Sequence, residues 1–275
     1  MCPLPLRALT WNLYHGRDRP PDPALFTWRS RVLRVSERND SHAQVNRDLF
    51  AAYAGVLTAA DWDVALLQEC PPRWAGPLAK ATGAAAHRVL TSRNSLAPLR
   101  TALARLNPDL IASNEGGSNL TLIRGDILDG HEFVLEPGPH PERRMLALTR
   151  ARPTAFDAEL CVANLHGSAG PALRHLAERE VLVAARTALD WAGDTPLLLG
   201  GDLNLRPSES AVFERLESEL GLVAPTAPNS LDHLLAVGLE PVEPAAAWPP
   251  ARREVASPAG AIRLSDHAPV GAAFG

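Results

Sequence analysis

Six apolar segments of this chain end abruptly on a carboxylate, a carboxamide or an imidazole side chain. They read LTWN at residues 9–12, LLQE at 66–69, VANLH at 162–166, LLLGGDLN at 197–204, LDH at 231–233 and LSDHAP at 264–269. A buried strand has no structural use for such groups at its end, so they are expected where a sheet presents chemical groups to a cleft. The pattern predicts an α/β protein whose strand ends form the walls of one site.

Turn chemistry is the competing explanation, because Asp and Asn commonly cap their own backbone after a strand. GGDLN at residues 200–204 would by itself fit an ordinary turn equally well. Turns, however, would scatter Gly, Pro, Ser and Asn, whereas these six ends are rich in groups that bind metals and move protons. The combination favours a functional site.

The chain has 275 residues, of which 46% are hydrophobic, enough to fill a sizeable core. We expect residues 1–275 to form a single domain and the protein to be a monomer. Apolar runs are short and interrupted by Arg, Asp or Pro, so no membrane span is expected. The first twelve residues lack the basic start and apolar stretch of a signal peptide, which predicts a cytoplasmic protein.

The net charge of −4 constrains the binding partner, because nonspecific nucleic-acid binders usually present a basic domain or stripe. Arginine is nevertheless clustered in residues 16–40, an Arg- and Pro-rich segment that we predict to be a long loop. Phe26 and Trp28 lie within this segment, so it could form a lip for an anionic substrate. A solvated loop is the competing interpretation, since acidic residues alternate with the arginines.

The remaining pattern alternates strands with helices and contains no internal repeat. Ser41 is expected to cap a helix that runs to about Ala60, and Pro171 to begin one that runs to about Trp191. The Pro- and Ala-rich residues 240–250 are expected to be an exposed connection. Such a series suits two sheets packed face to face with helices outside.

The strand ends contain six motifs: TWN, QE, NLH, GDLN, the Asp of LDHLL, and SDHAP. In this order and with these neighbours, they resemble the endonuclease/exonuclease/phosphatase family, also called the DNase I-like family. The resemblance runs from Thr10 to Pro269, nearly the whole chain. It implies a four-layer αββα sandwich in which two mainly antiparallel sheets pack face to face with helices outside. It also implies a metal-dependent enzyme that hydrolyses phosphate esters.

Metal-ligand candidates follow from the chemistry of the strand ends. Glu69 is a hard oxygen donor at a strand end and therefore suits Mg²⁺, with Mn²⁺ as an alternative. Asn12 can add a carbonyl ligand or a hydrogen bond to the phosphate. The resemblance implies that Asp266 also faces the metal.

Catalytic candidates occupy the other strand ends. Neighbouring strand residues point to opposite faces, so Asp266 is not expected to orient His267. The resemblance implies that Asp232 instead hydrogen-bonds His267, as a carboxylate orients the imidazole in hydrolytic triads. His233 is then expected to be a bystander on the opposite face.

The GDLN motif is expected to position the attacking water. Asp202 and Asn204 lie two apart, which on an extended segment places both on one face. The resemblance implies that Asp202 positions or deprotonates the water, while Asn204 holds the water or a phosphoryl oxygen. His166 and His267 would contact the phosphate, and which histidine acts as the acid stays open.

Three arginines are candidate phosphate clamps: Arg143 and Arg144, which precede a strand, and Arg124. Arginine at a strand border more often faces solvent, which is the competing interpretation.

Three functions remain open from the sequence. The first is a Mg²⁺-dependent endonuclease or phosphodiesterase acting on DNA or RNA. The second is a phosphatase or phosphodiesterase acting on a small or lipid phosphate, which the negative net charge favours. The third is a catalytically inactive binding domain, although no expected acid-base residue is missing. The abasic-site endonucleases and inositol polyphosphate 5-phosphatases of the family are disfavoured, because the mid-chain tyrosine of the former and the PxWCDR-like motif of the latter are absent.

Overall fold

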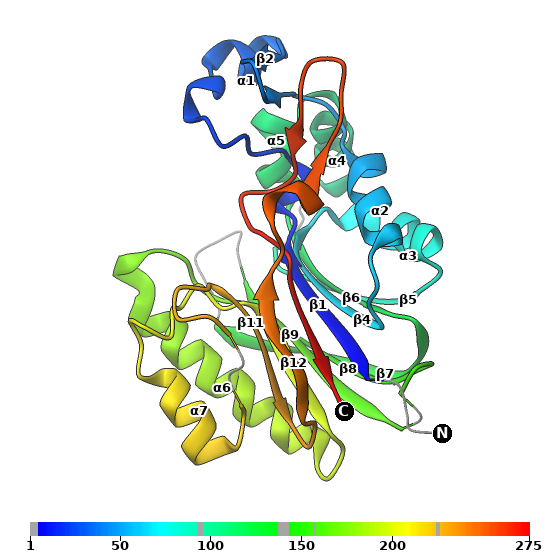
Figure 1. Cartoon of the computed structure of the whole chain (residues 1–275), viewed down its shortest axis with the longest axis vertical. Coiled ribbons are helices and arrows are strands. Elements are labelled where there is room, and N and C mark those ends of the chain that lie inside the picture. Colours follow the sequence, from blue (N-terminus) through cyan, green and yellow to red (C-terminus); the bar gives the residue numbers. More distant parts are fainter. Residues whose placement is uncertain (1–4, 93–95, 137–142, 157, 224–225) are drawn as a thin grey trace.

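Two β-sheets form the centre of the molecule (Figure 1). The computed structural model describes residues 5–92, 96–136, 143–156, 158–223 and 226–275. The first sheet contains β1 (Leu6–Asn12), β4 (Val64–Cys70), β5 (Ala85–Leu90), β6 (Ser118–Ile123), β12 (Pro241–Ala247) and β15 (Val270–Phe274). The second contains β7 (Gly125–Glu136), β8 (Arg144–Pro153), β9 (Leu160–His166), β10 (Leu197–Asp202) and β11 (Asp232–Val237).

The strand order is β12-β15-β1-β4-β6-β5 in the first sheet and β11-β10-β9-β8-β7 in the second. Each sheet has one pair of parallel strands among the described residues: β1 with β4 in the first and β9 with β10 in the second. All other neighbouring strands of the two sheets run antiparallel. The strands of a parallel pair end at the same edge of the sheet, so each sheet delivers two chemically active strand ends to one edge.

Side chains along the central strands alternate between two cores, as the pleat requires. Leu66 of β4 and Leu198 of β10 point into the apolar layer between the sheets. Their neighbours Leu67 and Leu199 point away from it, into separate apolar clusters that pack under the helices. The two sheets therefore pack face to face, and each is also apolar on its outer face.

Helices cover both outer faces. The helices are α1 (Trp28–Leu33), α2 (Phe50–Ala59), α3 (Ala75–Thr82), α4 (Ala97–Leu106), α5 (Pro108–Glu115), α6 (Arg174–Ala192) and α7 (Val212–Leu220). Helices α2 and α3 pack on the first sheet, and α6 and α7 pack on the second. This arrangement confirms the expected four-layer αββα sandwich. No helix in the described part of the chain is long and apolar enough to cross a membrane.

Short elements complete the chain. They are the 3₁₀ turns η1 (Tyr14–Gly16), η2 (Pro23–Leu25), η3 (Pro72–Trp74), η4 (Pro171–Leu173) and η5 (Pro250–Arg253), and the two-residue strands β2 (Glu37–Arg38), β3 (Ala43–Gln44), β13 (Glu254–Val255) and β14 (Ile262–Arg263). Helices α1, α4 and α5 gather with several of them at the upper end of the molecule in Figure 1.

The expectation of a long irregular loop over residues 16–40 was wrong in part, because the segment contains η2, α1 and β2. Helix α1 forms because Thr27 caps it: the Thr27 hydroxyl accepts a hydrogen bond from the backbone N–H of Ser30 at 3.1 Å. Asp22 caps η2 in the same way through Ala24, at 2.9 Å.

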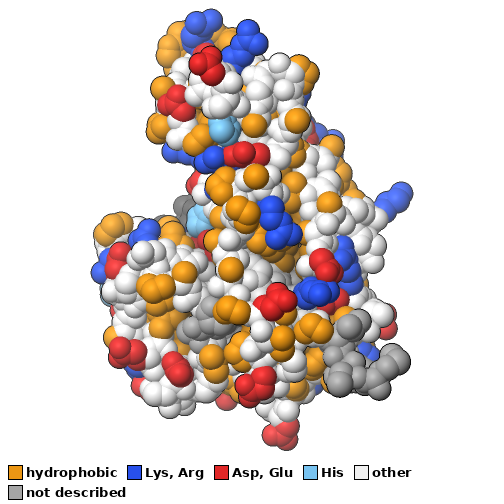
Figure 2. All heavy atoms as spheres, in the orientation of Figure 1, with side chains coloured by type: hydrophobic (Ala, Val, Ile, Leu, Met, Phe, Trp, Pro, Cys, Tyr) orange, Lys and Arg blue, Asp and Glu red, His pale blue; other side chains and the backbone are white. Residues whose placement is uncertain are grey.

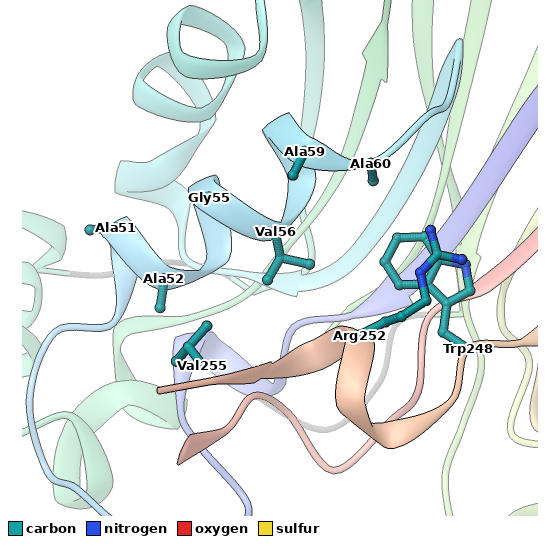
Figure 3. A pocket seen from close by; sticks show the side chains of 9 residues that line it. All are labelled: Ala51, Ala52, Gly55, Val56, Ala59, Ala60, Trp248, Arg252 and Val255. Carbon is teal, nitrogen blue, oxygen red and sulfur yellow. The ribbon is translucent and has the colours of Figure 1, made fainter. Parts of the chain in front are cut away.

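The surface is hollowed in two places. Figure 2 shows a recess between the end that carries α1 and the layer of α6 and α7, with a histidine at its edge. A separate groove of about 360 Å³ lies between α2 and the segment from Trp248 to Val255 (Figure 3). Its lining is mostly small or apolar and contains a single charged side chain, Arg252, stacked 4.1 Å from the Trp248 ring. That groove therefore lacks groups for acid-base chemistry.

Candidate active site

The sequence-predicted strand ends meet at one edge of the two sheets. Asn12 pairs with Gln68 in the first sheet, while Asp202 pairs with His166 on one side and with Asp232 on the other in the second. Strand register thus aligns His166, Asp202 and Asp232 in the second sheet, and the hydrogen bond between Asn12 and Asp202 joins them to the first.

Asp202 lies at the centre of this group and is 1% exposed. Its Oδ2 accepts a hydrogen bond from Asn12 Nδ2 at 2.9 Å. The Nε2 atoms of His166 and His267 each lie 3.6 Å from the same oxygen. One buried carboxylate oxygen is therefore surrounded by an amide and two imidazoles that come from both sheets and from the segment before β15.

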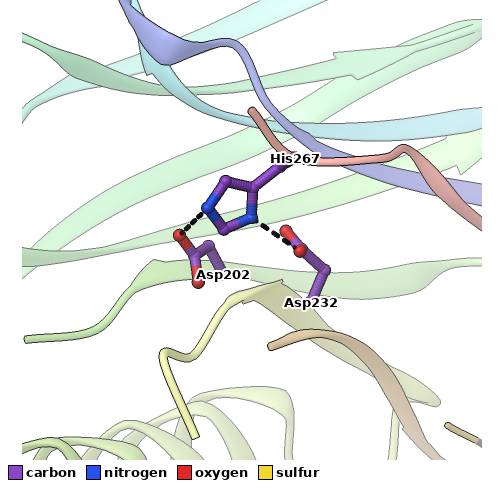
Figure 4. A group of neighbouring side chains, drawn as sticks. All are labelled: Asp202, Asp232 and His267. Atoms are coloured by element: carbon purple, nitrogen blue, oxygen red, sulfur yellow. Dashed lines mark hydrogen bonds and ion pairs between the residues drawn. The ribbon is translucent and has the colours of Figure 1, made fainter. Parts of the chain in front are cut away.

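Asp232 orients His267, as the family resemblance implied. Nδ1 of His267 lies 2.8 Å from Asp232 Oδ2, on the opposite side of the ring from Asp202 (Figure 4). Burial alone would lower the pKa of His267, but the bond to Asp232 and the charge of Asp202 raise this pKa to about 10. His267 is therefore a cation at neutral pH, and Nε2–H faces the site.

Sequence reasoning missed His15, the third residue after Asn12. Its Nε2 lies 3.1 Å from Glu69 Oε2, and Asn12 Nδ2 donates to Glu69 Oε1 at 3.3 Å. Burial would raise the pKa of Glu69, but the charges of His15 and His166 and the Asn12 hydrogen bond lower it. Glu69 is thus held ionised, as a metal ligand must be. The signal in the sequence was a histidine close behind the TWN motif.

The oxygen atoms of this region fit a divalent cation. Asp266 is exposed, and its pKa is raised by desolvation and by the nearby charge of Glu69. A cation bound beside Asp266 and Glu69 would offset the repulsion that Glu69 exerts on Asp266. The Asn12 Oδ1 atom accepts the Tyr14 N–H at 2.9 Å, which fixes the amide beside them.

The ligand-type atoms of Asp202, Asp232 and His267 also lie within 4.8 Å of one another. Two of the three, Asp232 and His267, already hydrogen-bond each other at 2.8 Å, so the cluster is accounted for as a hydrogen-bonded group.

Asn204 adopts a different geometry from the extended one expected. Strand β10 ends at Asp202, and Asn204 has a left-handed φ of 54°. Its backbone N–H donates to Asp202 Oδ1 at 3.1 Å, and its Nδ2 donates to the carbonyl of Gly167 at 3.1 Å. The turn, rather than strand alternation, keeps Asn204 beside Asp202.

Strained backbone gathers around the site. Glu69, Asn204 and Ser265 are not glycines, yet all have positive φ, as do Tyr14 and His15 in η1. Such conformations cost about 1–3 kcal/mol each and persist only where the surroundings enforce them. Their concentration next to the carboxylates supports a functional role for this edge.

The segment that carries His267 is held by groups that sequence reasoning missed. The Ser265 hydroxyl donates to the Asn12 carbonyl at 2.6 Å, and Trp11 Nε1 donates to the His267 carbonyl at 3.1 Å. The Arg253 guanidinium donates to the carbonyls of Leu264, Ser265 and His267. These bonds fix a segment that lies outside any regular strand.

A buried polar contact joins the two sheets next to the site. Gln68 Nε2 of β4 donates to Asn164 Oδ1 of β9 at 2.8 Å, and both side chains are fully buried. Each residue lies within two positions of a site residue, Glu69 or His166. Polar residues inside otherwise apolar strands were the signal for this contact in the sequence.

A cavity of about 590 Å³ opens beside Glu69, His15 and His166. Arg144 and Arg100 also line it, and Arg144 Nε donates to Ser168 Oγ at 3.2 Å. Arg144, the first residue of β8, therefore lies in the cavity wall beside Glu69 and His166, whereas Arg143 is exposed and does not line this cavity.

Arg124 lies elsewhere, and its assignment as a phosphate clamp does not fit the structure. Arg124 follows β6 at the end of the sheet opposite the site. Its guanidinium donates to the carbonyls of Trp62 and Ala60 and stacks 4.2 Å from the Trp62 ring. Arg124 therefore acts as a structural brace between the first sheet and the end of α2.

His233 points away from the site, as expected for a bystander. Its Nε2 lies 2.8 Å from the Leu205 carbonyl, and its ring packs 4.6 Å from the ring of Phe213 in α7. Burial lowers its pKa to about 4, so it is neutral and structural.

Comparisons with known proteins agree with this geometry. No curated protein matches the sequence. Among solved structures, the fold is similar to the human Nocturnin catalytic domain with bound sulfate, at 14% identity and a TM-score of 0.67 over 99% of this chain and 93% of that one. It is also similar to a mannosyl-6-phosphatase from Bacteroides thetaiotaomicron, at 14% identity and a TM-score of 0.65 over 98% and 99%.

A humanized TDP2 from D. rerio gives a TM-score of 0.64 at 14% identity over 98% of this chain and 99% of its own. These likenesses concern the fold. The sequence profile described as Endonuclease/Exonuclease/phosphatase family matches residues 9–267, which span all six strand ends. The chain therefore belongs to the endonuclease/exonuclease/phosphatase family.

Proposed function

We propose that this protein is a divalent-metal-dependent phosphodiesterase that cleaves DNA or RNA. Members of its family hydrolyse phosphoester bonds. The observation that most supports the proposal is the arrangement around Asp202: a buried carboxylate faces two imidazoles, one of which a second carboxylate orients at 2.8 Å. This combines a proton acceptor with a cation that can stabilise a phosphoryl oxygen.

Each group has a role that follows from its position. Asp202 accepts a proton from the attacking water, and Asn204 holds that water or a phosphoryl oxygen beside it. His267 donates a hydrogen bond from its cationic ring to the phosphate, and Asp232 keeps the ring oriented. His166 contacts a second phosphoryl oxygen, while Arg143 and Arg144 bind the flanking phosphate.

Glu69, Asp266 and Asn12 are the residues that would hold Mg²⁺. When bound, the ion would neutralise charge on the phosphoryl group and polarise it. Mn²⁺ fits the same oxygen donors.

A phosphatase or phosphodiesterase acting on a small or lipid phosphate is the second candidate. The net charge of −4 favours it, because a long polyanion is repelled by an acidic protein. It would use the same groups on a terminal phosphate.

The deciding experiment compares cleavage of plasmid DNA and of RNA with phosphate release from a panel of sugar, nucleotide and lipid phosphates, each with Mg²⁺ or Mn²⁺. We expect cleavage of the nucleic acid, loss of cleavage with EDTA, and loss in Asp202→Ala and His267→Ala. Asp61→Asn, an exposed carboxylate before β4, serves as the control that retains activity. Phosphate release without cleavage of nucleic acid would establish the second candidate instead.

A further inference from the structure

A second cavity, also of about 590 Å³, adjoins the site at η1. Tyr14 lines this cavity, while the next residue, His15, lines the cavity beside Glu69. Helix α5 likewise contributes to both, through Leu110 on one side and Asn114 on the other. The two cavities therefore follow one another along the surface, with the candidate metal ligands next to their junction.

The second cavity carries excess positive charge. Its lining includes the arginines at positions 17, 19 and 31, and one carboxylate, Asp109. Asp109 is 8% exposed and accepts a hydrogen bond from Gln44 Nε2 at 2.5 Å. In the described part of the chain, no carboxylate forms a salt bridge with these three guanidinium groups. An anionic ligand would add counter-charge for these guanidinium groups.

Aromatic rings alternate with these arginines. The Arg17 guanidinium lies 3.9 Å from the centre of the Tyr14 ring, and that of Arg19 lies 4.5 Å from the Phe26 ring. Trp28, at the start of α1, exposes 68% of its surface. Flat rings between guanidinium groups are typical of surfaces on which successive nucleobases stack while the charges follow the phosphates.

Positive charge lies on both sides of the candidate active site. Arg100 and Arg144 line the cavity beside Glu69, and Arg17 and Arg31 line the second cavity. Arg17 is close enough to Glu69 that its charge contributes to lowering the pKa of that carboxyl. A substrate with one terminal phosphate would need only one of these regions, whereas a strand with phosphates on both sides of the scissile bond would use both.

We propose that the second cavity binds a nucleotide of single-stranded nucleic acid next to the scissile phosphate, with its base stacked on Trp28 and its phosphate bound by Arg19 and Arg31. The assignment deepens, and rests on, the proposed phosphodiesterase function. It gives residues 16–40 the role of a substrate-binding lip.

The test uses Trp28→Ala and Arg31→Gln, since both side chains are exposed and their loss should leave the fold intact. Arg29→Gln is the matched control, because Arg29 is exposed on the same helix but does not line the cavity. Two substrates are compared: bis(p-nitrophenyl) phosphate, which is too small to span both cavities, and a fluorescein-labelled single-stranded 12-mer of DNA or RNA. Fluorescence anisotropy of the same 12-mer in EDTA measures binding without turnover.

We expect Trp28→Ala and Arg31→Gln each to raise the oligonucleotide KM and Kd about tenfold, as loss of one stacked base or one phosphate contact would. Turnover of the small diester should not change, and Arg29→Gln should match the wild type throughout. An unchanged Kd in both variants would overturn the assignment, even if the wild type cleaves the oligonucleotide.

Two further outcomes separate the alternatives. Binding of the 12-mer that depends on Trp28 and Arg31, without hydrolysis of either substrate, would support the cavity and contradict the proposed catalysis. Weaker cosedimentation of these variants with phosphatidylserine vesicles, with unchanged oligonucleotide binding, would show that the surface binds a lipid headgroup and would overturn the proposal.

Discussion

Asp232 and His267 illustrate how a single residue contact sets the chemistry of the candidate site. The two lie 35 positions apart in the chain yet form a 2.8 Å contact. Asp232 contacts the imidazole from one side, and the other nitrogen lies 3.6 Å from Asp202 and, in the proposed mechanism, faces the phosphate. The proposed mechanism therefore requires the anionic oxygen at position 232.

Asp232→Asn should lower kcat about 10²- to 10⁴-fold, because the amide removes the charge that stabilises the imidazolium. KM should change little, since Asp232 is not expected to touch the substrate. The measurement is steady-state hydrolysis of bis(p-nitrophenyl) phosphate, with circular dichroism to confirm folding. A kcat within threefold of the wild type would contradict the role assigned to Asp232.

Asp18 is a second residue whose environment has a measurable effect, here on stability. It is fully buried, and its Oδ2 accepts the Val45 N–H at 2.9 Å. Burial, together with the charge of Asp109, raises its pKa from 3.8 to about 8. Between these values the folded protein holds a proton that the unfolded chain has released, so stability falls as the pH rises from about 4 to 8.

Asp18→Asn should abolish this pH dependence, because the amide can still accept the Val45 N–H and carries no charge. We expect the variant to exceed the wild type in free energy of unfolding by about 2–4 kcal/mol at pH 8.5 and by less at pH 5. Urea denaturation at both pH values measures the difference. An equal difference at the two values would show that Asp18 is ionised throughout.

At the scale of elements, β10 depends on a glycine for its place beside β9. Gly201 has a φ of 140°, and a Cβ at this position would lie 1.8 Å from the Leu165 carbonyl oxygen. No side chain can be accommodated without moving a strand that carries His166. The GG of the GGDLN motif is therefore structural, and it brings Asp202 close to β9.

Gly201→Ala should destabilise the protein by about 4 kcal/mol or more, or prevent folding. Gly221→Ala is the control: this glycine caps α7 with a φ of 69° and has open space around it, so the cost should be about 1 kcal/mol. Chemical denaturation of the two variants gives the comparison. Similar losses in both would mean that β9 and β10 adjust to the extra atom.

Two segments, residues 41–49 and 240–250, differ from the sequence expectation because their backbone groups hydrogen-bond to distant parts of the chain. The helix expected from Ser41 begins only at Phe50 as α2. Ala43 N–H instead donates to the Ala261 carbonyl at 2.9 Å, and Val45 N–H donates to Asp18. Residues 240–250, expected as an exposed connection, contain the edge strand β12, whose pairing with β15 is interrupted by two register shifts. An edge tolerates the prolines there, because one side of the strand needs no partner.

At the scale of the whole molecule, the candidate metal ligands come from segments far apart in the chain. Asn12 ends β1, Glu69 lies in β4, and Asp266 precedes β15, while Asn12 also bonds Asp202 of the second sheet. An ion that binds this set only when the chain is folded must stabilise the folded state.

Mg²⁺ should therefore raise the Tm by a few degrees at concentrations about tenfold above its Kd, equivalent to about 1.4 kcal/mol. Glu69→Gln should remove the shift, whereas Glu217→Gln, an exposed position on α7, should retain it. Differential scanning fluorimetry with and without EDTA measures the effect. A shift that persists in Glu69→Gln would place the ion elsewhere.

The sequence by itself determined the family, the αββα fold and the residue types at each strand end, because apolar strands that end on Asp, Asn and His are local patterns. Only the packing of two sheets could decide which ends meet. It paired His15 with Glu69, placed Arg124 at the opposite end of the sheet, and placed Arg17, Arg19 and Arg31 in the wall of a cavity. Contacts across tens of residues depend on register and sheet packing, which periodicity along the chain does not encode.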